Sequence, residues 1–262
     1  MQNELSMLMD SYQDFTYMVA EYNILNKKLK SHVKENHNKA IIDYYSLRLK
    51  IVDKSTYADE LIPYLMDNNL KYFINKNIDN KKINEMVSEK ILDRDYVISN
   101  IEFEKSVLDI KLRELPEKLE NFKEQTISSV NNHSLIKVVQ RRELLKTRID
   151  ESRYLYYKYA KELKDLMRQE GFSQYRFQYN DDIGLLKIRT TGRVYSKDFI
   201  GFIDETHNEA IKLSVDSKKL MKSKDKNIDR DYVDRHKKES FQEYLYVSIV
   251  RSALNRSLNK RN

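Results

Sequence analysis

All four glycines of this 262-residue chain lie between Gly171 and Gly201. Glycine adopts positive φ angles at little cost, so it collects where the backbone turns tightly, whereas the interiors of long helices disfavour it. The sequence therefore predicts one non-helical insert, residues 171–204, between long helical segments. Charged residues make up 34% of the chain and there are only two prolines, a composition that favours solvated helices over a sheet protein.

The first helical segment has apolar side chains at alternating spacings of three and four residues, as in a coiled coil. Two asparagines interrupt this seam, and a polar residue at such a position commonly fixes the register of helix pairing. The pattern is equally typical of a long helix inside a bundle, so pairing within one chain and pairing between chains both stay open. The seam positions are Leu5, Leu8, Tyr12, Phe15, Val19, Tyr22, Asn26, Leu29, Val33, Asn36 and Ala40.

Two further segments have the same pattern. One runs from Ile83 to Leu115 and the other from about Glu117 to Glu170. A helix of about 40 residues would be roughly 60 Å long. The predicted fold is therefore mainly α, with long helices in an elongated bundle or coiled-coil-like arrangement over residues 1–170 and a small β-hairpin insert around residues 172–203. Seam positions of the third segment include Leu135, Val138, Arg142, Leu145, Ile149, Ser152, Tyr156, Tyr159, Leu163 and Leu166.

Period-two alternation predicts the hairpin within the insert. Tyr175, Phe177 and Tyr179 alternate with polar residues, and the Asn-Asp-Asp sequence at 180–182 has the composition of a turn. A strand of this kind buries one face and exposes the other. We expect the aromatic side chains to pack on the helices while arginine and lysine face water.

Residues 205–262 are predicted to form basic C-terminal helices. Thr206 and Glu209 have the spacing of a capping box, which predicts a helix start there. A final helix is expected from Asp229 through Leu258. From residue 212 onward there are 14 lysines and arginines against 7 aspartates and glutamates, a difference equal to the whole net charge of +7. Such an excess favours contact with nucleic acid or with an acidic partner.

One pentapeptide occurs twice, at Asp93–Val97 and at Asp229–Val233, with the sequence Asp-Arg-Asp-Tyr-Val. Aspartates at a helix start are favoured by the helix dipole. Because the flanking sequences diverge, the repeat is interpreted as coincidence or shared helix-start chemistry and not as a duplication.

Several classes of chemistry lack the residues that they need. The chain has no cysteine, which excludes disulfides, thiolate metal sites and a cysteine nucleophile. Neither a phosphate-binding loop nor a dinucleotide-binding fingerprint is present. The spacing of His32 and His37 does not place both rings on one helical face as metal ligands. We expect no catalytic residues, no metal and no cofactor.

Aromatic and cationic side chains on the hairpin, together with the lysines that follow it, are the candidates for contact with nucleic acid or with a protein partner. Aromatic rings can stack on bases, and cations can contact phosphates. The candidates are Tyr175, Arg176, Lys187, Arg189, Arg193, Lys218, Lys219, Lys222, Lys224 and Lys226.

The leading hypothesis is a non-enzymatic, oligomerising structural or assembly protein. The abundance of Lys, Asn, Ile and Tyr is typical of A/T-rich coding, which makes a bacteriophage virion component (neck, collar or scaffold) a concrete candidate. The alternative is a nucleic-acid-binding accessory protein that uses the basic C-terminal region and the hairpin. The N-terminal stretch lacks the features of a signal peptide, and no apolar run approaches about 18 residues, so the protein is expected to be soluble and intracellular, with no membrane partner.

Overall fold

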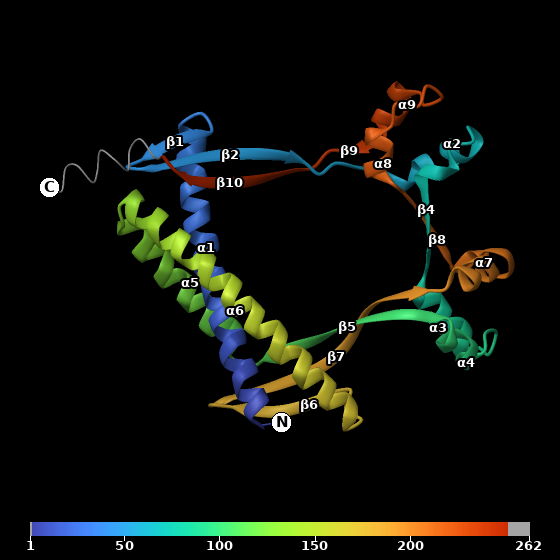
Figure 1. Ribbon diagram of the computed structural model, residues 1–262, viewed down its shortest axis with the longest axis horizontal. Coiled ribbons are helices and arrows are strands. Elements are labelled where there is room, and N and C mark those ends of the chain that lie inside the picture. The colour runs from blue at the N-terminus through green and yellow to red at the C-terminus, as the bar shows by residue number, and fades with distance from the viewer. Residues whose placement is uncertain (1, 251–262) are drawn as a thin grey trace. The chain divides into compact units, whose positions relative to one another are not determined.

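The computed structural model of the chain describes residues 2–250 and has a mixed α/β fold (Figure 1). Ten strands within these residues form four antiparallel sheets, so the prediction of a mainly α fold with one small hairpin is wrong. The described residues divide into two compact units, each assembled from separate stretches of the chain. We call them the helical unit (residues 2–50, 107–189 and 243–250) and the two-lobed unit (residues 51–106 and 190–242).

Three helices form the core of the helical unit: α1 (Gln2–Glu35), α5 (Leu115–Asn132) and α6 (Leu135–Gln169). Helices α1 and α6 run antiparallel, because Ser11 approaches Ser152 while Glu21 approaches Arg141 further along. The first and third predicted seams therefore pack against each other within one chain. Helix α5 packs on α1, where the Tyr17 and Phe122 rings lie 4.9 Å apart.

A three-stranded sheet lies at each end of the α1/α6 pair. One sheet has the order β1 (Lys39–Ile42), β2 (Tyr45–Asp53), β10 (Phe241–Ile249), and the other has the order β6 (Gln174–Tyr179), β7 (Asp182–Tyr195), β5 (Ile101–Leu112). Leu47 and Leu49 of the first sheet and Phe177 and Leu186 of the second are buried against the helices. The predicted hairpin is thus β6 and β7, and its Gly184 lies so close to the Phe177 ring that a Cβ atom would overlap it.

The two-lobed unit is built around an antiparallel pair of strands, β4 (Ile74–Ile78) and β8 (Ile211–Val215). The first lobe contains α3 (Asn80–Ser88), α4 (Arg94–Ser99) and α7 (Lys197–Thr206), and its core includes Ile83 and Phe199. The second lobe contains α2 (Ile62–Asp67), α8 (Ser217–Lys222), α9 (Arg230–Arg235) and the short strand pair β3 (Thr56–Tyr57) and β9 (Lys237–Lys238). Short 3-10 turns occupy Asp59–Leu61, Lys71–Phe73 and Asn208–Ala210.

The second predicted seam is wrong as a single helix. Residues 83–115 form most of α3, all of α4, the strand β5 and the first residue of α5. The misreading has a geometric cause, because residues four apart share a face in a strand as well as in a helix. Leu108 and Leu112 meet this condition, and both are buried on one face of β5.

The predicted basic C-terminal helices are also largely wrong. Thr206 ends α7 instead of starting a helix, and Ile211–Val215 and Phe241–Ile249 are strands. Strand β10 buries Leu245 and half-buries Glu243 and Val247, so these positions follow the period of two of a strand. The helix was predicted from three-residue spacings of apolar side chains in the same stretch. The last part of the predicted helix, from residue 251, lies outside the described residues. Within residues 2–250 no helix combines the length and the apolar character that crossing a membrane requires.

Candidate functional site

The hairpin candidates lie where the alternation predicts. Tyr175 and Tyr179 are half-buried and Phe177 is buried against the core of the helical unit, while Arg176 and Lys187 are exposed. The Tyr179 hydroxyl also donates a hydrogen bond to the Asp10 carboxylate of α1. The aromatic face is therefore used for packing, and Arg176, Lys187 and Arg189 are the exposed cations among the hairpin candidates.

Arg189 already has a carboxylate partner. Its Nε donates to Asp109 Oδ2 at 2.6 Å, across β7 and β5 of the helical unit. The guanidinium lowers the pKa of the Asp109 carboxyl, and the carboxylate raises the pKa of Arg189. The charge of Arg189 is thus largely balanced at its own position.

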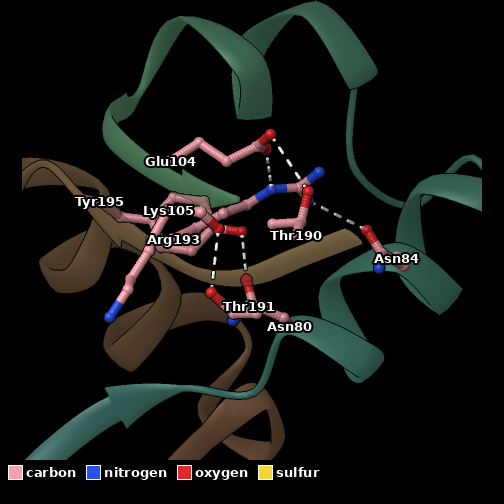
Figure 2. Close-up of polar contacts among 8 residues, drawn as sticks. All are labelled: Asn80, Asn84, Glu104, Lys105, Thr190, Thr191, Arg193 and Tyr195. Atoms are coloured by element: carbon pink, nitrogen blue, oxygen red, sulfur yellow. Dashed lines mark hydrogen bonds and ion pairs between the residues drawn. The ribbon is translucent and has the colours of Figure 1, made fainter. Parts of the chain in front are cut away.

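Arg193 lies in the two-lobed unit, at the centre of a polar cluster (Figure 2). Its Nε donates to Glu104 Oε2 at 2.8 Å, and its Nη1 donates to Asn84 Oδ1 at 3.4 Å. Thr190 Oγ1 donates to the other oxygen of Glu104 at 3.1 Å. This hydrogen bonding raises the pKa of Arg193, with Glu104 as the main cause.

Two further hydrogen bonds lie beside this cluster. The Tyr195 hydroxyl donates to Asn80 Oδ1 at 2.8 Å, and Thr191 Oγ1 donates to the Lys105 carbonyl at 3.2 Å (Figure 2). The sequence missed these partners because Asn84 and Glu104 belong to a segment predicted as a long helix, and no pattern singled out Asn80. Their contacts join segments about a hundred residues apart, which no local pattern reveals.

The five lysine candidates are all exposed, on α8 and in the loop that follows it in the two-lobed unit. Lys219 Nζ donates to the Tyr72 carbonyl at 2.8 Å and lies 5.3 Å from the centre of the Tyr72 ring. Two carboxylates lie within the same stretch, since Asp216 caps α8 and Asp225 accepts a hydrogen bond from the Tyr72 hydroxyl. The structure thus groups the lysines but places Arg189 in the other unit.

A groove of about 350 Å³ runs between α1 and α6 in the helical unit. Its floor is formed by two buried serines, Ser11 and Ser152, whose small side chains allow the helices to approach closely. Met7 and Leu155 on its walls are 45% and 41% exposed, so part of their apolar surface faces the groove opening. The remaining lining residues are Asp10, Asp14, Met18, Arg148, Glu151 and Tyr159.

The α1/α6 groove is lined by more negative than positive charge. Three carboxylates line it against one guanidinium, and the groove residues Asp14, Arg148 and Glu151 are exposed. Apolar walls with an acidic rim suit a ligand that is apolar on one side and basic on the other. No sequence pattern singled out this groove, because it needs two helices more than a hundred residues apart.

A second groove, of about 480 Å³, lies between α1 and α5. Lys28 within it donates to the Val130 carbonyl at 2.6 Å, and Asn131 and His133 also accept from its ammonium group. A lysine that satisfies the terminal carbonyls of a helix stabilises the attachment of that helix. This groove is therefore part of how α5 is held on α1.

Comparisons with family models, with curated proteins and with solved structures found no match. The functional assignment therefore rests on the surfaces described above.

Proposed function

We propose that this protein is a non-enzymatic assembly component that self-associates, and that the α1/α6 groove receives a basic, apolar segment of a second copy. The observation that carries the proposal is the groove itself, which combines exposed Met7 and Leu155 with an acidic rim. Apolar side chains at the centre of an interface supply affinity, and complementary charge supplies orientation.

The occupant is the sequence that follows β10. Residues 251–262 contain four lysines and arginines and no acidic residue, with Leu254 and Leu258 among them. The basic residues complement Asp10, Asp14 and Glu151, and the leucines complement the apolar walls. This stretch lies outside the described residues, so the assignment rests on its composition.

The described part of the chain ends close to the groove of its own copy. The Val250 amide donates to the Tyr44 carbonyl, and the Tyr44 hydroxyl accepts a hydrogen bond from Gln140 of α6. From Gln140 to Glu151 the helix rise amounts to about 17 Å, and twelve residues span at most about 40 Å when fully extended. Twelve residues therefore suffice for either groove, and the dependence of the mass on protein concentration separates binding within one copy from binding between copies.

The test reverses the charge of the groove. Asp14→Lys with Glu151→Lys should raise the dissociation constant of self-association at least ten-fold, as measured by sedimentation over a range of protein concentrations. Glu162→Lys is the matched control, since Glu162 is an exposed residue of α6 outside the groove. Reversing the tail as well, with Arg256→Glu and Lys260→Glu, should restore association.

An association that is equally strong in the groove variant and the control would refute the proposed interface. A chain that stays monomeric at every concentration would refute self-association itself.

Binding of nucleic acid is a second candidate, supported by the five exposed lysines of residues 218–226. If the protein binds nucleic acid, neutralising these lysines should flatten the salt dependence of binding. The slope of log K against log salt concentration should fall by about one unit for each phosphate that the variant no longer neutralises. Neutralising Arg189 and Arg193 should leave the slope nearly unchanged, since each already pairs with a carboxylate. A gel-shift series across salt concentrations decides, and no binding at low salt would remove this candidate.

A further inference from the structure

Most elements of the described chain occur twice in the same order (Figure 1). A helix of 34 residues, α1, is followed by the hairpin β1–β2, and a helix of 35 residues, α6, is followed by the hairpin β6–β7. After each hairpin come a short helix (α2 or α7) and a 3-10 turn, then a five-residue strand (β4 or β8), two short helices (α3 and α4 or α8 and α9) and a last long strand (β5 or β10). The first series also has the short strand β3 and the 3-10 turn Asp59–Leu61 before α2, and the second has the short strand β9 before β10. Helix α5 joins the two series and has no counterpart within residues 2–250.

The register of β4 and β8 is that of a twofold axis. Lys76 pairs with Leu213 at the centre, and Ile74 pairs with Val215 at one end while Ile78 pairs with Ile211 at the other. Each residue of β4 corresponds to the residue of β8 that lies 137 positions later. The central pair therefore joins two equivalent positions, which is the arrangement that a twofold axis through this pair produces.

Backbone hydrogen bonds in the two-lobed unit repeat about the same axis. The Asp79 amide donates to the Ala210 carbonyl at 2.8 Å, and the Asp216 amide donates to the Phe73 carbonyl at 2.7 Å. The next equivalent pair joins Ala58 to the His236 carbonyl at 3.0 Å and Ser196 to the Asn100 carbonyl at 2.9 Å. Each bond links one series to the other, so neither lobe is made from one series alone.

Side chains follow the same correspondence. Lys82 donates to the Glu209 carbonyl, and its counterpart Lys219 donates to the Tyr72 carbonyl. In the repeated pentapeptide, Asp93 caps α4 and Asp229 caps α9, and Val97 and Val233 are buried in the two lobes. Shared helix-start chemistry explains why both aspartates cap a helix. It does not explain why the two copies of the pentapeptide occupy equivalent places in the fold.

The helical unit, taken by itself, also repeats its local structure. After α1 the Asn38 amide donates to the Val33 carbonyl, and after α6 the Phe172 amide donates to the Met167 carbonyl. Positive φ follows each helix end, 56° at His37 and 66° at Asn38 after α1 and 76° at Gly171 after α6. The last strand of each series completes the sheet of the other, since β10 pairs with β2 and β5 pairs with β7.

We propose that the chain is a fused pair of equivalent halves, residues 2–113 and 135–250, and that each half carries a surface complementary to a copy of itself. The partner that this surface fits is a second copy of the same half, and α5 is the connection that makes the pairing intramolecular. In each half, this surface consists of three parts: the face of the long helix (α1 or α6) that packs on its counterpart, the five-residue strand (β4 or β8), and the last strand (β5 or β10), which pairs in the sheet of the other half. This inference does not depend on the α1/α6 groove or its occupant.

The test uses the absence of cysteine from the chain. A protease site is inserted after His133, in the connection between α5 and α6, and a single cysteine is introduced as Lys76→Cys. The protein is cleaved, unfolded and refolded with both fragments present under oxidising conditions. In a pair of first halves, position 76 lies opposite position 76, so its cysteines can form a disulfide at the Cα separation of a strand pair.

We expect at least ten-fold more disulfide-linked first-half dimer from Lys76→Cys than from the matched control Asn75→Cys. Position 75 pairs with Ser214, the counterpart of position 77, so its cysteines would not face each other. The uncleaved double variant Lys76→Cys with Leu213→Cys should form its internal disulfide, which verifies the register and the oxidation. Equal dimer from Lys76→Cys and Asn75→Cys, with the internal disulfide formed, would overturn the inference.

Discussion

Arg142 shows how the polar interruptions of a helix seam are resolved at the scale of single residues. Its side chain is 5% exposed and its Nε donates to Asn26 Oδ1 at 2.9 Å, so two polar seam positions from α1 and α6 satisfy each other. Its Nη2 donates to the Leu245 carbonyl of β10, and the guanidinium lies 5.0 Å from the centre of the Tyr22 ring. One buried cation thereby fixes the register of α1, α6 and β10.

Arg142→Met should therefore lower the free energy of unfolding by about 1–3 kcal/mol, because Asn26, the Glu143 carboxylate and a buried carbonyl lose their partner. The neighbouring variant Arg141→Met is the control. Arg141 is exposed and pairs with Glu21, and such a pair contributes about 0–1 kcal/mol. Urea unfolding of both variants measures the difference, and equal losses would show that the buried network does not fix the packing.

The buried hydroxyl of Tyr156 should make the folded protein less stable at alkaline pH. Burial raises the pKa of its hydroxyl to about 12, with nearby Tyr12, Tyr157 and Asp109 adding to the shift. Since an unfolded tyrosine has a pKa near 10, the folded state binds the proton more tightly. The resulting stability is complete below about pH 10 and is lost as the pH rises towards 12.

Tyr156→Phe should lose less stability than the parent protein between about pH 10 and pH 12, in urea unfolding at fixed pH values. Absorbance at the tyrosinate band should also lack one late-titrating group in this variant. Identical pH profiles for the two proteins would contradict the burial of this hydroxyl.

At the scale of elements, the repeated pentapeptide offers a matched comparison of caps. Asp93 accepts a hydrogen bond from the Tyr96 amide, and Asp229 accepts one from the Tyr232 amide. Replacing either cap with alanine should cost about 1 kcal/mol. Asp95→Ala and Asp231→Ala, two residues later, should each change stability by less than about 0.5 kcal/mol. Thermal unfolding of the four variants checks both statements, and a cost that differs greatly between the two caps would argue against equivalent places in the fold.

The same elements mark what sequence could predict. Glycine placement and alternation located the β6–β7 hairpin, and the seams located most of α1 and α6, because both signals arise within a few turns of chain. The first seam was predicted too far, since Asn36 and Ala40 lie past the end of α1 and Ala40 belongs to β1, and the third segment is divided into α5 and α6. Strands β5 and β10 were missed because their apolar spacings of three, four and seven residues fit a helix, while their strand character depends on pairing with β7 and β2. The Arg193 cluster and the α1/α6 groove were out of reach for the same reason, since each is assembled from distant segments.

At the scale of the whole molecule, the central claim is head-to-tail association, with residues 251–262 of one copy in the α1/α6 groove of the next. Such an interface is heterologous, so each chain offers one groove and one tail, and removing either from every copy stops growth. Two differently impaired chains should complement each other, because one still offers a groove and the other still offers a tail.

The most direct measurement is therefore the mass of a mixture. A chain that lacks residues 251–262 and a chain with Asp14→Lys and Glu151→Lys should each be monomeric by sedimentation. Mixed in equal amounts, they should form a complex of two chains and nothing larger, since the intact groove of the first receives the intact tail of the second. A mixture that stays monomeric while the parent protein associates, or impaired chains that associate alone, would contradict this account.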